Sequence, residues 1–144
     1  MTNLKGITCA AFGAVGGFIT QLFGGWTEDM ITLIAFMAID FVMGLIVAGV
    51  FHKSNKSENG NLNSRAGWKG LCKKCVTLLF VLVVHRLDVS LGTSYIRTAT
   101  IIAFIANEIL SIVENAGLMG IPLPNVITKA IDILKNRGDE DERS

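Results

Sequence analysis

Charged residues are scarce in this chain of 144 residues, at 17%, and aromatic residues make up only 8%. Hydrophobic residues reach 51%, and the mean hydropathy of +0.52 lies in the range expected where lipid is the solvent. The net charge is only +1. This excludes a strongly basic nucleic-acid-binding protein, because affinity for phosphate depends on clustered Lys and Arg. The few charges stand in short clusters between long apolar stretches, as a membrane would impose.

Cysteine is also scarce. Cys9, Cys72 and Cys75 are an odd number, so they predict no disulfide framework. The last two have CxxC spacing, but a tetrahedral zinc ion needs two further ligands that the sequence does not offer. No nucleophile with a matched base and no phosphate-binding loop is visible either. The sequence therefore predicts no enzyme, no cofactor and no metal site.

Long apolar segments predict an all-α integral membrane protein with three to four transmembrane helices. Each segment is close to the ~20 residues that cross a bilayer. The expected spans are about residues 7–25, 30–51, 71–91 and 95–119. After two prolines, an amphipathic helix at about 125–136 is too short to span and is expected at the membrane surface. We expect one transmembrane domain over residues 1–136, followed by a charged, disordered tail at 137–144.

Small residues recur at helical spacing in the first two segments. Gly13 and Gly17 form a GxxxG pattern, which lets another helix approach closely. Gly44 and Ala48 have the same spacing in the second segment. We predict that these residues serve helix packing and oligomerisation, and the alternative is a merely flexible, glycine-rich helix.

Asp40 lies near the middle of the second segment. An aspartate at the centre of a membrane helix costs roughly 2.5–3.5 kcal/mol on insertion scales, so it should face a protein partner or water rather than lipid. Two interpretations stay open. The carboxyl group either locks helix packing by hydrogen bonding or takes part in assembly and the aqueous path.

The third and fourth segments are predicted to form an antiparallel helical hairpin that turns at Gly92 and Thr93. In this register Asp88 lies opposite Arg97, so that opposite charges meet. The same register joins polar residues at the far end of the hairpin, where Lys73 and Lys74 lie beside Ser111 and Glu114.

The fourth segment carries a polar stripe made of Asn107, Glu108, Ser111, Glu114 and Asn115. Such a stripe on an apolar membrane helix indicates contact with water or a protein partner, or burial against the third helix. With charged residues elsewhere in the spans, it defines the intramembrane polar and pore candidates: Asp40, Asp88, Arg97, Asn107, Glu108, Ser111, Glu114 and Asn115.

Basic residues gather around the loop at 52–68, which is rich in Ser, Asn and Gly and is expected to be mobile. They are Lys53, Lys56, Arg65, Lys69, Lys73 and Lys74. The positive-inside rule predicts that this loop is cytoplasmic. With two spans before it and two after it, both chain termini are expected in the cytoplasm.

The sequence NEILSIVENAG at 107–117, followed by GIPLP at 120–124, resembles the phage lysis and toxin-secretion holins of clostridial and related phages. Weaker matches lie at 40–44, 64–74 and 85–88, and the likeness covers roughly residues 30–136. Members of that family are often drawn with three spans, whereas the segments here indicate four.

The resemblance implies a protein that accumulates in the bacterial cytoplasmic membrane, forms homo-oligomers and opens a lesion or pore. An endolysin or a secreted toxin would pass through it, and host cell lysis would follow. An antiholin is an expected functional partner. The alternative functions are an antiholin itself or a small ion channel without a large lesion, and the size of what passes distinguishes them.

Overall fold

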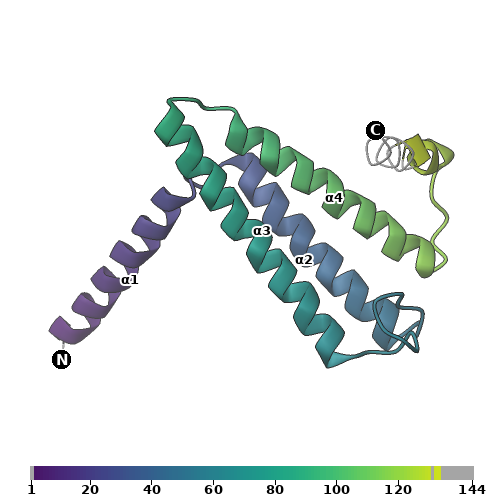
Figure 1. Cartoon of the computed structure of the whole chain (residues 1–144). Coiled ribbons are helices and arrows are strands. Elements are labelled where there is room, and N and C mark those ends of the chain that lie inside the picture. The colour runs from purple at the N-terminus through teal and green to yellow at the C-terminus, as the bar shows by residue number, and fades with distance from the viewer. Residues whose placement is uncertain (1, 131, 134–144) are drawn as a thin grey trace. The chain divides into compact units, whose positions relative to one another are not determined.

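The computed structural model describes residues 2–130 and 132–133, and over these residues it is all-helical, as predicted. Four long helices follow one another along the chain (Figure 1). They are α1 (Thr2–Leu22), α2 (Glu28–Gly49), α3 (Ser64–Leu91) and α4 (Ile96–Leu118). Residues 125–130 and 132–133 are also helical. The rest of the predicted surface helix and the tail at 137–144 lie outside the described residues.

The helix boundaries follow the predicted segments, with two differences at the N-terminal ends. α1 begins at Thr2 rather than near residue 7, and α3 begins at Ser64 rather than near residue 71. The early start of α3 has a local cause, because the side-chain Oδ1 of Asn63 accepts a hydrogen bond from the backbone N of Arg65 at 2.9 Å. An asparagine in this position is a favourable helix N-cap. Residues 64–68, predicted as loop, therefore belong to α3.

Two of the helices are long and apolar enough to cross a membrane by length and composition. They are α2, with 22 residues, and α4, with 23. α1 and α3 are 21 and 28 residues long, but within the described residues they do not combine the same apolarity with so few charges. The count of three to four spans therefore stays a prediction.

The chain divides into two compact units. Among the described residues, the first unit combines 2–35 with 71–105, and it contains the α1–α2 turn and the α3–α4 turn. The second unit combines 36–70 with the described residues from 106 onward, and it contains the α2–α3 loop and the C-terminal half of α4.

Each of the last three helices has one buried stripe with roughly heptad spacing, as in helices that pack along a common seam. α2 buries Met30, Leu33, Met37, Asp40 and Val47. α3 buries Val81, Val84 and Asp88, and α4 buries Arg97, Ile101, Glu108 and Asn115. Every stripe contains at least one charged residue among apolar ones. The contacts of these charged residues are the most informative feature of the fold.

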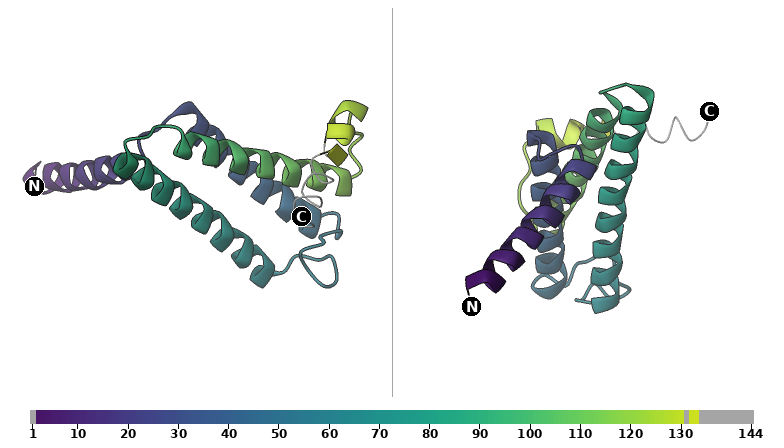
Figure 2. Two further views of the ribbon diagram at one scale, coloured as in Figure 1. Left: turned by 45° about the horizontal axis from the view of Figure 1, so that its top comes forward. Right: turned by 90° about the vertical axis from the view of Figure 1, so that its left-hand side faces the viewer.

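α1 differs from the other helices because its apolar side chains are exposed along its length. Leu4 is 71% exposed, Phe12 79% and Phe18 63%. Within the first unit, α1 extends away from the other helices (Figures 1 and 2). Such a surface needs lipid or a protein partner to cover it.

Candidate functional site

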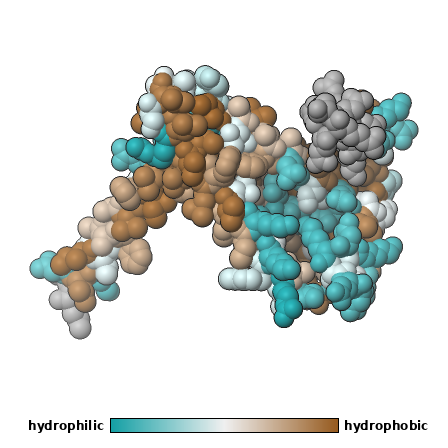
Figure 3. Space-filling view, in the orientation of Figure 1, coloured by the Kyte–Doolittle hydropathy of each residue, from teal (hydrophilic) through white to brown (hydrophobic). Residues whose placement is uncertain are grey.

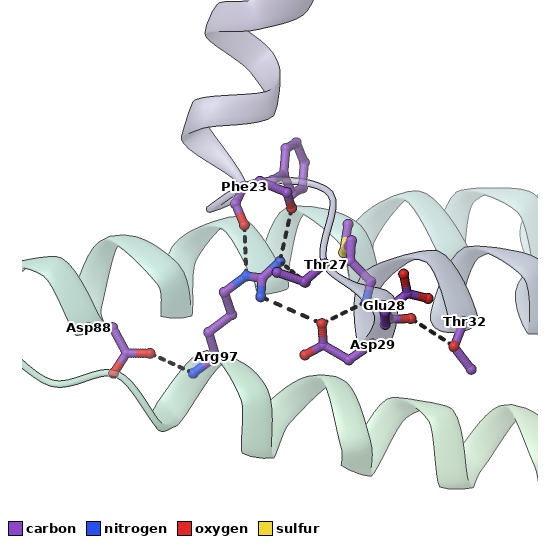
Figure 4. A network of polar contacts seen from close by, with 9 residues as sticks. Phe23, Thr27, Glu28, Asp29, Thr32, Asp88 and Arg97 are labelled. Atoms are coloured by element: carbon purple, nitrogen blue, oxygen red, sulfur yellow. Dashed lines mark hydrogen bonds and ion pairs between the residues drawn. The ribbon is translucent and has the colours of Figure 1, made fainter.

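Arg97 is the centre of a polar network in the first unit (Figure 4). Its side chain is buried near the start of α4, and its guanidinium group faces the α1–α2 turn. Nε donates to the carbonyl oxygen of Phe23 at 2.7 Å, and Nη2 donates to the carbonyl of Gly25 at 3.3 Å and to Oγ1 of Thr27 at 3.1 Å. Nη1 lies 3.8 Å from Oδ1 of Asp29, which makes an ion pair. One side chain thus fastens the turn.

The α1–α2 turn is built to receive this cation. Carbonyl groups at a helix C-terminus lack helical partners and carry partial negative charge, which an arginine satisfies. Gly24 and Gly25 have φ values of +81° and +91°, a conformation that favours glycine. A Cβ at Gly24 would lie 2.7 Å from the His85 ring and 3.1 Å from Nε of Arg97. The close approach of α3 and α4 side chains therefore also requires glycine.

Asp88, near the end of α3, caps the start of α4. Its carboxylate accepts hydrogen bonds from Oγ1 of Thr93, from the backbone N of Ile96 at 3.2 Å and from the backbone N of Arg97 at 2.7 Å. The first backbone N–H groups of a helix have no helical acceptor, so a carboxylate there is stabilising. The turn itself follows α3 at Gly92, with a φ of +67°, so the predicted hairpin turn is confirmed.

Asp88 and Arg97 meet as the hairpin register predicts, but the predicted ion pair is wrong. The carboxylate of Asp88 bonds to the backbone of Arg97, while the guanidinium turns to Asp29 (Figure 4). The physical reason is that both groups have better partners. The start of α4 offers N–H donors to an anion, and the α1–α2 turn offers carbonyl acceptors to a cation.

The second unit contains a buried polar pair between α2 and α4. Nδ2 of Asn115 donates to Oδ1 of Asp40 at 2.9 Å and to the backbone carbonyl of Asp40 at 3.4 Å. Each of the two residues is only 4% exposed. The hydrogen bond supports the packing interpretation of Asp40, and a role in assembly stays a proposal. In the part of the chain that the structure describes, no buried side-chain nitrogen or oxygen lacks a partner.

The polar residues of α4 lie on two adjoining rows rather than on one stripe. Glu108 and Asn115 are buried, whereas Asn107 and Glu114 are exposed and Ser111 is intermediate. Glu108 and Asn115 are seven residues apart and form an inward row along the helix. Asn107 and Glu114 have the same spacing and form an outward row beside it. In addition, Oε1 of Glu114 accepts a long hydrogen bond of 3.4 Å from Nδ2 of Asn55 in the α2–α3 loop.

The predicted packing glycines lie on open surface. A Cβ added at Gly13, Gly17 or Gly44 would meet no described atom within 4 Å beyond the local helix. Ala48 is buried instead. The Gly13 and Gly17 positions on α1 are therefore accessible to a second helix, which leaves the oligomerisation hypothesis as a proposal.

The basic residues around the α2–α3 loop are mostly exposed: Lys53, Lys56, Arg65, Lys69 and Lys73, with Lys74 half-buried. Lys73 and Lys74 belong to the first unit, and Ser111 and Glu114 to the second. The predicted contact between these two pairs stays a prediction.

Sequence reasoning missed the residues that hold Arg97. Two of its acceptors are backbone carbonyls, which leave no side-chain pattern, and the acidic pair Glu28 and Asp29 does not by itself indicate a partner. The signal that could have indicated the site is the pair Gly24 and Gly25 between two helices, because a glycine turn exposes carbonyl groups. The loop partner of Glu114 likewise left no recognisable pattern.

Two membrane-length helices and charged residues on the buried stripes are features of a small helical membrane protein. The chain belongs to the bacteriophage holin family, which matches residues 17–136. It is similar to a probable holin of Bacillus phage phi105, with 33% identity over 71% of this chain and 70% of that protein. The predicted resemblance to phage holins is thereby confirmed.

Two further relatives come from bacteria. An uncharacterized protein of Halalkalibacterium halodurans is 38% identical over 85% of this chain and 87% of its own length. An uncharacterized 14.9 kDa protein in the nagH 3' region of Clostridium perfringens is 35% identical over 86% of this chain and 89% of its own. No solved structure matches the chain.

Proposed function

We propose that the protein acts as a pore-forming holin, which oligomerises in the bacterial cytoplasmic membrane and opens a lesion that releases an endolysin or a toxin. Membership of the bacteriophage holin family supports this function. The observation that carries it is the outward polar row of α4. Asn107 lies at the middle of this helix, which is long and apolar enough to cross a membrane, and its side chain is exposed.

In a single copy, the exposed amide of Asn107 would face lipid hydrocarbon, which is energetically unfavourable. Hydrocarbon offers no hydrogen-bond partner, so polar side chains in membrane helices associate with other helices or with water. Glu114 continues the same row two turns later. Association of several copies would pair these groups first, and a larger assembly would bring the row into contact with the water of a lesion.

The polar groups that are paired inside one chain support a period in which the protein accumulates in the membrane without permeabilising it. Asp40 accepts a hydrogen bond from Asn115 inside one chain, and both residues are buried, so this contact forms without a second copy. The network of Arg97 likewise satisfies its charge internally. We propose that the inward groups stabilise the inserted monomer and that the outward row of α4, with the Gly13 and Gly17 face of α1, drives assembly.

The proposed topology has four spans, with both termini and the α2–α3 loop in the cytoplasm. The excess of Lys and Arg around that loop supports this orientation, because basic loops are retained on the cytoplasmic side. The acidic residues Glu28 and Asp29 at the opposite end of α2 would then lie outside.

Expression of the chain in bacteria, with and without a cytoplasmic endolysin, tests the function. A lesion-forming holin should cause abrupt lysis when the endolysin is present, and loss of viability without lysis when it is absent. Loss of membrane potential with the endolysin still retained would instead show a small ion channel. If the chain has no effect by itself but delays the lysis that a second, co-expressed holin causes, it is an antiholin.

A further inference from the structure

We propose that the α2–α3 loop and the first turns of α3 form a binding site for the phosphate headgroup of an anionic phospholipid. A cavity of about 350 Å³ lies there, within the range of roughly 300–1,000 Å³ typical of ligand pockets. Its walls are Lys56, Ser57, Glu58, Asn63, Arg65, Ala66 and Lys69. The inference goes beyond the proposed function but rests on the same membrane insertion of α2.

The cavity is electropositive. Lys56, Arg65 and Lys69 contribute three positive charges against the single negative charge of Glu58. Among the described residues, none of these three basic side chains forms an ion pair. Arg65 and Lys69 are one helical turn apart and point to the same side of α3. The N-terminus of α3 adds partial positive charge, so the walls suit an anion with several acceptor oxygens.

The loop that forms the outer wall is held by its own hydrogen bonds. The backbone N of Ser54 donates to the carbonyl of Gly60 at 3.0 Å, and Oγ of Ser57 donates to the carbonyl of Asn61 at 2.7 Å. Gly60 has a φ of +73°, and a Cβ there would collide with the carbonyl oxygen of His52. These contacts give the loop a defined shape, and residues 56–58 of this loop line the cavity together with Arg65, Ala66 and Lys69 of α3.

The surroundings identify a lipid rather than a free phosphate ion as the occupant. The loop follows directly after α2, a helix able to cross a membrane. Two large apolar side chains next in sequence to cavity-lining residues are exposed, Leu62 at 61% and Trp68 at 67%. Tryptophan at a membrane–water boundary typically sits at headgroup depth. Hydrophilic residues gather over this end of the second unit (Figure 3), and basic residues here would face the anionic cytoplasmic leaflet.

Lipid binding to the purified full-length protein in nonionic detergent tests the site. Native mass spectrometry would compare dioleoyl phosphatidylglycerol with dioleoyl phosphatidylcholine, and a separate series would add inorganic phosphate alone. The variant Arg65→Gln/Lys69→Gln removes two cavity charges. The control Lys53→Gln/Lys129→Gln removes two exposed charges that do not line the cavity. Circular dichroism would establish that both variants retain their helices.

We expect wild-type protein to prefer phosphatidylglycerol by about 25-fold or more, because each of the two substituted cations should contribute about fivefold to the preference. The variant should therefore lose most of the preference, and the control should keep it. Equal binding of both lipids, or equal losses in variant and control, would overturn the proposal. Displacement of phosphatidylglycerol by millimolar inorganic phosphate would show a phosphate-ion site and overturn the lipid assignment. Since lysis is not the readout, failure of the holin function would leave this result unchanged.

Discussion

The carboxylate of Asp88 accepts a 2.7 Å hydrogen bond from the backbone N of Arg97, while the guanidinium group of the same arginine forms its ion pair with Asp29. One residue thus joins two turns. Its backbone belongs to the cap of α4, and its side chain fastens the α1–α2 turn. The relationship between Asp88 and Arg97 is therefore directional, and exchanging the two side chains cannot preserve it.

The exchange Asp88→Arg/Arg97→Asp should be no better than the worse single variant. An arginine at 88 cannot accept the N–H groups of α4, and an aspartate at 97 cannot donate to the carbonyls of Phe23 and Gly25. Loss of the cap alone should lower stability by about 0.5–2 kcal/mol. Membrane accumulation and thermal unfolding in detergent measure the effect, compared as a double-mutant cycle. Recovery in the double variant would show a simple ion pair instead.

Asp40→Asn should insert and accumulate normally, because the amide oxygen can still accept the hydrogen bond of Asn115. Asp40→Leu removes the carboxylate acceptor and leaves the buried amide only its long hydrogen bond to the backbone carbonyl of residue 40, so it should lower stability by about 1–3 kcal/mol. The double variant Asp40→Leu/Asn115→Leu should regain much of this loss. Thermal unfolding in detergent measures stability, and culture turbidity measures lysis.

The charge of Asp40 has a separate expected effect. If it contributes to assembly, Asp40→Asn should shift the time of lysis although the monomer is stable. Unaltered timing in both Asp40→Asn and Asp40→Leu would mean that the residue has no role in assembly, and unaltered thermal unfolding of Asp40→Leu would exclude the packing role as well.

Gly17→Ile should weaken cross-linked oligomers and delay or abolish lysis, because a side chain there keeps a second helix away from the backbone. Monomer accumulation should be unchanged, since a Cβ at Gly17 meets no described atom within 4 Å beyond its helix. Ala11→Ile is the matched control, because Ala11 is also exposed but lies on the opposite side of α1. Identical cross-linking ladders from wild type and Gly17→Ile would remove this face from the assembly.

The topology can be tested with single cysteines at Asn59 and Ser144 in a background where Cys9, Cys72 and Cys75 are replaced by alanine. Both thiols should resist membrane-impermeant reagents in intact cells before lysis, because the basic loop and the tail are expected in the cytoplasm. Labelling of position 144 from outside, with position 59 still protected, would replace four spans by three.

The helices could be predicted because long apolar runs and the glycines at the turns mark them directly. The start of α3 could not, since it depends on the cap by Asn63. Helical periodicity placed Asn107 and Glu108 on a polar stripe, but adjacent residues differ by about 100° in direction, and only packing decides which one faces inward. The partners of Arg97 were missed because backbone carbonyls become visible only once the turn has a geometry.

Thiol labelling beside the outward row of α4 during lysis tests most directly whether this row becomes wetted when copies assemble. Ala103 is exposed and lies one helical turn before Asn107 on the same side of α4, so a cysteine there reports on the row and leaves Asn107 in place. Ala103→Cys and the control Ile102→Cys, which is exposed on another side of α4, would be made in the cysteine-free background and expressed with an endolysin. A water-soluble thiol reagent modifies a cysteine only where water reaches it, because the reactive form is the thiolate. The proposed function predicts that position 103 is unreactive during accumulation and reacts as lysis begins, while position 102 stays unreactive. Complete lysis with position 103 unreactive throughout would contradict it.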